Sequence, residues 1–89
     1  MLLETNEKNR SMRVVTEDIV YRCHIINNNT VMVAEDHYGN YIAPVEDYSY
    51  EGKSESDEEW LLNALRKFKK EVDKYISSKN IVVRKRVLL

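Results

Sequence analysis

The chain of 89 residues has little of what marks several large classes of protein. Its single cysteine, Cys23, cannot form an internal disulfide or a cysteine-ligated zinc site. One proline and two glycines exclude a collagen-like or low-complexity chain. No apolar run approaches the roughly 18 residues that a membrane-spanning helix needs, and Glu4 interrupts the apolar start before a signal-peptide core can form. These absences predict one small, cytoplasmic protein without a disulfide framework.

The formal net charge of −1 conceals an uneven distribution along the chain. Residues 1–65 carry 5 basic and 13 acidic side chains, whereas residues 66–89 carry 9 basic and 2 acidic ones. Nine of the carboxylates lie between residues 35 and 59, against one lysine. Because charge distribution governs association more than it governs fold, this asymmetry favours recognition of a charged partner.

Residues 1–11 are polar and without a pattern, and they are expected to be a disordered lead-in. The remaining residues, 12–89, are expected to form one small domain. Within it, residues 19–26 are rich in β-branched and aromatic types, which predicts a strand. Cys23 would lie on one face of this strand and His24 on the other, because the side chains of a strand alternate.

Turn signals divide the next part of the chain. The three asparagines at residues 27–29 tolerate left-handed backbone angles, and Gly39 lies near the centre of a second turn. Connections this short favour antiparallel hairpins. Further strands are predicted at residues 14–15, 30–34, 41–45 and 81–89, and residues 46–55 hold either a short strand or a loop.

The clearest signal is the start of a helix. Ser56 and Glu59 form a capping box, in which each side chain satisfies a backbone donor of the first turn. The helix is predicted over residues 57–77, with an apolar stripe that faces the core. The stripe consists of Leu61, Leu65, Phe68, Val72 and Tyr75 or Ile76. The chain is therefore expected to be α+β: an antiparallel sheet of about four strands with one long helix packed on one face, in the order β-β-β-(β)-α-β.

The sequence offers little for catalysis. It has no glycine-rich phosphate loop, and His24 and His37 lie 13 residues apart without further metal ligands at a defined spacing. Cys23 and His24 are neighbours on a strand, so they point to opposite faces and form no catalytic dyad. We therefore predict no enzymatic activity, no catalytic residue, no metal ion and no cofactor. A small enzyme or metal protein that uses His24 or His37 remains an alternative.

A series of motifs between residues 30 and 77 resembles the HicB-like antitoxin family. Its elements are Glu35-Asp36, Gly39, Tyr41, Ala43, Val45 and Asp47, then Ser56-Asp57-Glu58-Glu59 and Asn63-Ala64. The resemblance implies a partial RNase H-like fold without catalysis. It also implies a partner, a small, basic, RNA-cleaving toxin of the HicA-like type, whose active site the protein would block.

An acidic surface between residues 46 and 59 suits such a partner, because it steers a basic protein and occupies its phosphate-binding groups. Two tyrosines in this part of the chain are the expected aromatic anchors. The candidate partner-binding residues are Asp36, Glu46, Asp47, Tyr48, Tyr50, Glu51 and Glu55. The leading hypothesis is a non-enzymatic, antitoxin-like binding protein that neutralises a basic, nucleic-acid-acting protein.

Two other functions fit parts of the sequence. A phage- or virus-type inhibitor of a host defence nuclease would use the same acidic surface as a mimic of nucleic acid. A nucleic-acid-binding module would use basic side chains of the helix and of the C-terminal residues. Its candidate residues are Lys67, Lys70, Lys74, Arg84 and Arg86. Self-association into a homo-oligomer is also expected, because a small domain has a limited core and a terminal strand at a sheet edge is open to pairing.

Overall fold

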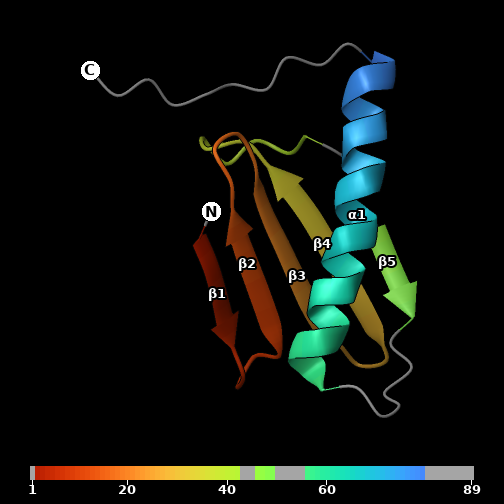
Figure 1. Ribbon diagram of the computed structural model, residues 1–89. Helices are drawn as coiled ribbons and strands as arrows, with labels where there is room; N and C mark the ends of the chain where they lie inside the picture. Colours follow the sequence, from red (N-terminus) through yellow and green to blue (C-terminus); the bar gives the residue numbers. More distant parts are fainter. Residues whose placement is uncertain (1, 43–45, 50–55, 80–89) are drawn as a thin grey trace.

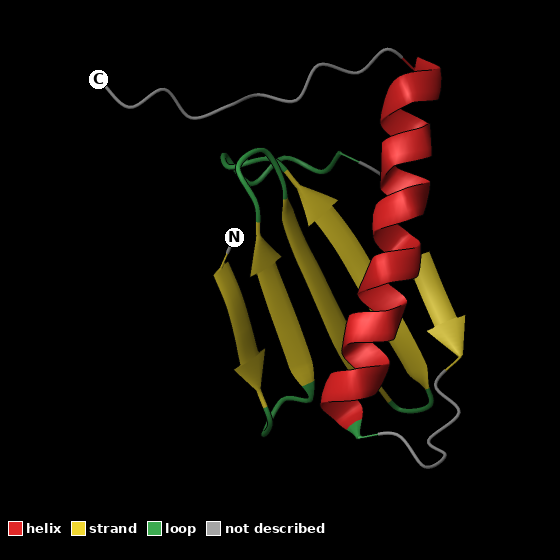
Figure 2. Cartoon of the chain, in the orientation of Figure 1, coloured by secondary structure: helices red, strands yellow, loops and turns green. Residues whose placement is uncertain are grey.

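The computed structural model describes residues 2–42, 46–49 and 56–79, and it shows five strands followed by one helix (Figure 1). The elements are β1 (Leu2–Asn6), β2 (Ser11–Val15), β3 (Val20–Ile26), β4 (Asn29–Glu35), β5 (Glu46–Ser49) and α1 (Asp57–Lys79). Each strand pairs antiparallel with its neighbour in the chain, so the order in the sheet is the order in the sequence. The helix lies across one face of this sheet (Figure 2). The predicted α+β class is confirmed, with five strands where about four were expected.

The strand β1 corrects the prediction of a disordered lead-in at residues 1–11. Leu2–Asn6 pairs with β2, and a tight turn closes this first hairpin. In the turn, the amide of Asn9 donates a hydrogen bond to Oδ1 of Asn6 at 3.1 Å. The prediction was wrong because every residue of β1 is exposed, so the strand carries no alternation of apolar and polar side chains.

The alternation along β3 is confirmed. Tyr21 and Cys23 are buried beneath the helix, whereas Arg22 and His24 are exposed on the other face. The turn to β4 contains Asn27 with a φ of 55°, a left-handed conformation that asparagine tolerates. This turn therefore occurs where the asparagines predicted it.

The predicted strand at residues 41–45 is present only as a short contact in its described part. Tyr41 forms a single antiparallel bridge with Glu35, and the amide of Ile42 donates to the carbonyl of Ala34 at 2.9 Å. Residues 43–45 lie outside the described residues. Residues 41–42 therefore pair with the C-terminal end of β4, whereas β5 pairs with the N-terminal part of β4.

The strand β5 answers the question that the sequence left open about residues 46–55. Glu46–Ser49 pairs antiparallel with β4 and forms the last strand of the sheet. The rest of this segment, residues 50–55, lies outside the described residues. The predicted final strand at residues 81–89 also lies outside them.

The helix begins where the capping signal predicted. The Oγ of Ser56 accepts the amide N–H of Glu59 at 3.2 Å, which is one half of the predicted capping box. The helix continues to Lys79, slightly beyond the predicted end at residue 77. Its buried side chains are Leu61, Ala64, Leu65, Phe68 and Val72. Within the described residues, no helix combines the length and apolar character that crossing a membrane requires.

The core lies between α1 and the covered face of β2, β3 and β4. The ring of Phe68 packs edge-on against Tyr21, with ring centroids 6.3 Å apart and planes at 85°. Thr30 is fully buried, and its hydroxyl accepts a hydrogen bond from Nε1 of Trp60 at 2.6 Å. This bond ties the first turn of the helix to β4, so it fixes where the helix starts on the sheet.

Candidate functional site

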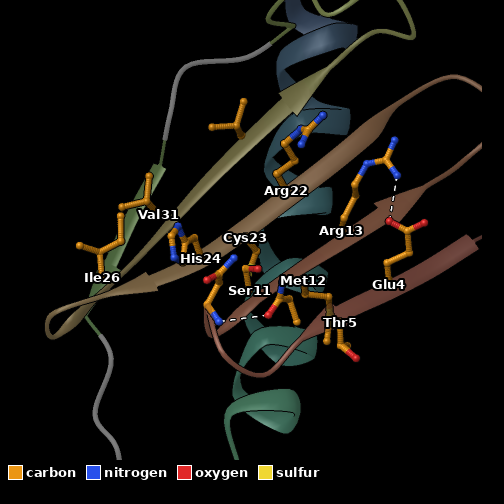
Figure 3. Close-up of a pocket in the computed structure, with 13 residues that line it drawn as sticks. Glu4, Thr5, Ser11, Met12, Arg13, Arg22, Cys23, His24, Ile26 and Val31 are labelled. Atoms are coloured by element: carbon orange, nitrogen blue, oxygen red, sulfur yellow. Dashed lines mark hydrogen bonds and ion pairs between the residues drawn. The ribbon is translucent and has the colours of Figure 1, made fainter.

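The face of the sheet opposite α1, here called the open face, carries charged side chains on neighbouring strands. Glu4 on β1 pairs with Arg13 on β2, and Arg13 pairs with Arg22 on β3. Directly paired residues of an antiparallel sheet project from the same face. Figure 3 shows both arginines in front of the strands, with the helix behind them. The fold therefore places two guanidinium-bearing side chains next to each other.

Each of these arginines is bound by one carboxylate. Nη1 of Arg13 lies 3.0 Å from Oε2 of Glu4, and Nε of Arg22 lies 2.7 Å from Oε1 of Glu35. The side chain of Glu35 is only 15% exposed, so the second ion pair is partly shielded from water. The Nε of Arg13 is buried and has no hydrogen-bond partner among the described residues. Because buried polar atoms are normally paired, this N–H can accommodate an acceptor from outside the chain.

A hollow of about 750 Å³ lies on the open face and includes this row of charges (Figure 3). Asn6, Ser11 and His24 add polar groups to its lining, and Val31 and Val33 add aliphatic ones. In the sheet, Asn6 pairs with Ser11 and Ser11 with His24, so these polar residues form a second row beside the charged one. The hollow is therefore both charged and capable of hydrogen bonding.

A second surface lies where the turn between β1 and β2 meets the start of α1. It is here called the acidic end, and it comprises Glu7, Asp57, Glu58 and Glu59. Arg10, in the turn, donates through Nε and Nη2 to the two carboxylate oxygens of Asp57, at 2.7 and 2.9 Å. This forked ion pair holds the turn against the helix.

A recess of about 330 Å³ lies between the turn and the helix start, lined in part by Glu7, Arg10 and Glu58. The carboxylates of the first helical turn lie at the positive end of the helix dipole, where negative side chains stabilise the helix. The acidic end carries four carboxylates against two basic side chains, Lys8 and Arg10. It is therefore a negatively charged surface with a concave centre.

The helix carries the opposite charge along its remaining length. Residues 66–79 contain six basic and two acidic side chains. Lys67, Lys70 and Lys74 are all exposed and recur at spacings of three and four, so they form one stripe on α1. Nζ of Lys74 lies 3.6 Å from Oε1 of Glu71, and this ion pair partly neutralises the positive charge at the end of the stripe.

Asp36 has a different role from the surface charge that the sequence predicted. It is only 7% exposed, and its Oδ1 accepts the amides of Tyr38 at 2.8 Å and Asn40 at 2.9 Å. Its Oδ2 accepts Nδ2 of Asn40 at 3.1 Å. The same turn contains Gly39 with a φ of 85°, a conformation that favours glycine. The Asp36 carboxylate therefore holds this turn together.

The other predicted partner-binding residues fall in or after β5. The strand contains Glu46, Asp47 and Tyr48, which pair with Met32, Val31 and Thr30 of β4. Tyr50, Glu51 and Glu55 lie outside the described residues, as do Arg84 and Arg86. The structure thus brings together Lys67, Lys70 and Lys74, and it places Asp36 in the turn after β4 rather than on β5.

The three side chains considered for catalysis or metal binding, Cys23, His24 and His37, lie in different surroundings. Burial raises the pKa of the Cys23 thiol to about 12, which keeps it protonated and unreactive near neutral pH. His24 is exposed on the open face, and Nε2 of His37 lies 2.9 Å from the carbonyl oxygen of Thr16. Within the described part of the chain, no three His, Cys, Asp or Glu side chains are grouped as metal ligands would be.

Sequence reasoning missed Arg10, Arg13 and Arg22. A row across three strands exists only once the pairing register is known, and no single strand displays it. One signal was present: Glu4, Arg13 and Arg22 follow one another at intervals of nine residues. Two consecutive hairpins with this repeat place such residues opposite one another, as the register confirms.

The fold and these surfaces define a small α+β protein whose sheet is covered by a helix on one face. The chain matches no protein-family model, and comparisons with curated proteins and with solved structures give no match.

Proposed function

We propose that the chain is a small, non-enzymatic binding protein that neutralises a basic, nucleic-acid-acting protein in the manner of an antitoxin. The observation that carries this proposal is the acidic end, where the exposed Glu7 and Glu58 line a recess and Glu59 is exposed on the same helical turn. A concave, negatively charged surface suits the lysines and arginines with which a nuclease holds phosphates. Occupying those side chains prevents the enzyme from binding its substrate.

The Arg10–Asp57 pair supports this assignment by showing how the surface binds a guanidinium. The fork takes up both oxygens of one carboxylate, and the side chains of Arg10 and Asp57 are each 40% exposed. Glu58 and Glu59, on the same helical turn, are exposed and offer carboxylates to a partner. The acidic end thus contains one satisfied arginine site beside two open carboxylates.

The motifs that resemble HicB-like antitoxins add a second line of support, because the helix start Ser56-Asp57-Glu58-Glu59 is both a motif element and the centre of the acidic end. A phage- or virus-type inhibitor of a defence nuclease would use the same chemistry. The identity of the captured partner distinguishes the two: a toxin encoded beside this chain supports the antitoxin, and a nuclease of a different genome supports the inhibitor.

The test uses a partner captured on the immobilised chain, identified by mass spectrometry and then purified. Its binding is measured by calorimetry at 50 and 300 mM salt with the variant Glu7→Gln/Glu58→Gln/Glu59→Gln. Exposed charge pairs contribute about 0.5 kcal/mol each, so the variant is expected to bind about tenfold more weakly, with a smaller dependence on salt. The matched control is Glu17→Gln/Glu71→Gln/Asp73→Asn, which removes three exposed carboxylates elsewhere. Equal weakening in both variants would remove the acidic end from the proposal.

A second candidate function, binding of nucleic acid, is favoured by one observation. Lys67, Lys70 and Lys74 form an exposed stripe on the helix. If three phosphates are bound, the affinity for a duplex should fall about 40-fold between 50 and 200 mM salt. Fluorescence anisotropy with single- and double-stranded oligonucleotides measures this. The variant Lys67→Gln/Lys70→Gln/Lys74→Gln should abolish the effect, and absence of binding at 50 mM salt contradicts this function.

A further inference from the structure

We propose that the open face of the sheet holds a binding site for a phosphate monoester, formed by Arg13 and Arg22. The hollow shares Thr5, Asn6 and Ser11 with the recess of the acidic end, but the site uses side chains of the opposite charge, so it goes beyond the function proposed above. Either of the two proposals can fail without affecting the other.

Two like charges lie side by side on the open face. Arg13 and Arg22 are directly opposite each other in the register of β2 and β3. Directly opposed side chains have Cβ atoms about 5 Å apart, and like charges in this position repel each other. Glu4 forms an ion pair with Arg13 and Glu35 forms one with Arg22, so each carboxylate balances the charge of one arginine. An anion that contacts both guanidinium groups would relieve the repulsion between them.

In the described part of the chain, one N–H donor of Arg13 remains without an acceptor. A guanidinium group presents five N–H donors in a fixed fork. Nη1 of Arg13 lies 3.0 Å from Oε2 of Glu4, and Nε of Arg22 lies 2.7 Å from Oε1 of Glu35. The Nε of Arg13 is buried without a hydrogen-bond partner in the described structure, although Arg13 lines the hollow. An oxygen of a bound phosphate supplies the acceptor that this N–H lacks.

Further hydrogen-bonding groups lie beside the two arginines. Ser11 and His24 form the neighbouring row and line the same hollow, where they provide a hydroxyl and an imidazole (Figure 3). A phosphate has three terminal oxygens, so it can accept from arginine on one side and from these groups on the other. The hollow of about 750 Å³ leaves room for the group that carries the phosphate, beside Val31 and Val33.

The number of acceptor oxygens favours a phosphate monoester over a carboxylate. Glu4 and Glu35 already balance the formal charge of the two arginines, so the ligand is held by charge-assisted hydrogen bonds rather than by a net positive charge. A phosphate monoester presents three terminal oxygens to these donors, one more than a carboxylate, and it carries a charge of about −1.5 to −2 at neutral pH. Such a group occurs both on a free mononucleotide and at the 5′ end of a nucleic acid strand. The same site chemistry serves both sources.

The full chain is titrated separately with inorganic phosphate, with adenosine monophosphate, and with an oligonucleotide that either carries or lacks a 5′-phosphate. Calorimetry measures the affinity, and changes in the amide NMR shifts locate the binding site. The expected shifts concentrate at Ser11, Arg13, Arg22 and His24. Binding should weaken about tenfold in Arg13→Gln and in Arg22→Gln, because each removes charge-assisted hydrogen bonds. The matched control is Arg66→Gln, an exposed arginine on the helix, which should bind like the unchanged chain.

The oligonucleotide pair distinguishes the two sources of phosphate. Preference for the 5′-phosphorylated strand over adenosine monophosphate assigns the site to strand ends, and the reverse preference assigns it to free nucleotides. Arg13→Lys keeps the positive charge, so it distinguishes loss of the binding site from a folding defect. This variant should still bind phosphate more weakly than the unchanged chain because it lacks the Nε donor. The proposal is overturned if Arg13→Gln and Arg22→Gln bind phosphate as the unchanged chain does, or if Arg66→Gln weakens binding equally.

Discussion

The strands β2, β3 and β4 contribute to both faces of the sheet, and the two faces differ in what their side chains do. On the covered face, buried side chains such as Tyr21, Cys23 and Met32 pack against the helix. On the open face, Arg13 and Arg22 form ion pairs within a hollow. Because strand side chains alternate, residues that stabilise the core and residues of the proposed binding site are direct neighbours along these strands.

This difference between the covered face and the open face predicts which substitutions change stability and which change binding. The covered face gains stability from apolar burial, which is lost when a buried side chain is shortened. The open face gains little from ion pairs in contact with water. Variants of the covered face should therefore change the free energy of unfolding, and variants of the open face should change binding with the fold intact.

The largest expected effect is on the covered face, in Phe68→Ala. Phe68 is 1% exposed and packs against Tyr21, so its truncation leaves a cavity in the core. The free energy of unfolding should fall by about 3–5 kcal/mol in urea denaturation. Lys67→Ala, at the adjacent exposed position, is the control and should stay within about 0.5 kcal/mol. Similar losses in both variants would contradict the assignment of this helical face to the core.

A rise in pH should be the next most damaging change to the covered face. Burial raises the pKa of Cys23 to about 12, and burial together with the carboxylates of Asp73 and Asp18 raises the pKa of Tyr21 to about 12. In the unfolded chain these groups ionise near pH 8.5 and 10, so the unfolded state releases protons that the folded state keeps.

The stabilisation that these protons give is complete below about pH 8.5 and is lost progressively as the pH rises towards 12. Urea midpoints measured at pH 7, 9 and 10.5 should fall in that order. Cys23→Ala should flatten the early part of the fall, between pH 8.5 and 10, because it removes the group that ionises first. A midpoint that stays constant up to pH 10.5 would show that the two groups are not buried as described.

A smaller loss is expected from Thr30→Val, which conserves shape and removes the hydroxyl that accepts from Trp60. A hydrogen bond of this kind contributes about 1 kcal/mol. The free energy of unfolding should fall by about that amount, and the fluorescence maximum of the single tryptophan should shift. Thr16→Val, which removes a hydroxyl in the turn between β2 and β3, provides a comparison outside the covered face. An unchanged tryptophan spectrum in Thr30→Val would contradict the bond.

Arg10 lies in the turn between β1 and β2, outside both faces of the sheet, where it binds the start of α1. Arg10→Ala and Arg10→Gly both lose the ion pair with Asp57, which contributes at most about 1 kcal/mol at this exposure. Because Arg10 has a φ of 50°, alanine retains the strain of the left-handed backbone and glycine relieves it. Arg10→Gly should therefore be more stable than Arg10→Ala by about 0.5–1 kcal/mol. Thermal unfolding of both variants measures the difference, and the reverse order would exclude the left-handed turn.

The smallest effect should be that of Arg22→Gln on the open face. The change removes an ion pair with Glu35 and also removes repulsion from Arg13. The two contributions oppose each other, so the free energy of unfolding should stay within about 0.5 kcal/mol. A loss above 1.5 kcal/mol in urea denaturation would show that the open face stabilises the fold, and the separation of the two faces would no longer hold.

Local signals made much of the covered face predictable. The capping serine at residue 56, the stripe ending near Val72 and the alternation around Cys23 each depend on neighbours within one element. The strand β1 escaped prediction because none of its side chains is buried, and periodicity reports burial. The charged row of Glu4, Arg13 and Arg22 on the open face was not predicted, because its members lie on three different strands. Asp36 was visible as a carboxylate, but the turn that takes up its oxygens is a property of the folded backbone.

The order of the strands has a consequence for how the chain folds. Each of the five described strands is paired with its immediate neighbour in the sequence, so the pairing joins segments that are close along the chain. Contacts between residues close in sequence have a low loop-closure cost, and chains rich in them fold quickly. Among the described residues, distant segments meet where α1 docks onto β2, β3 and β4 and where Arg10 binds Asp57. Closure of the helix over the preformed hairpins is therefore the expected rate-limiting step of folding.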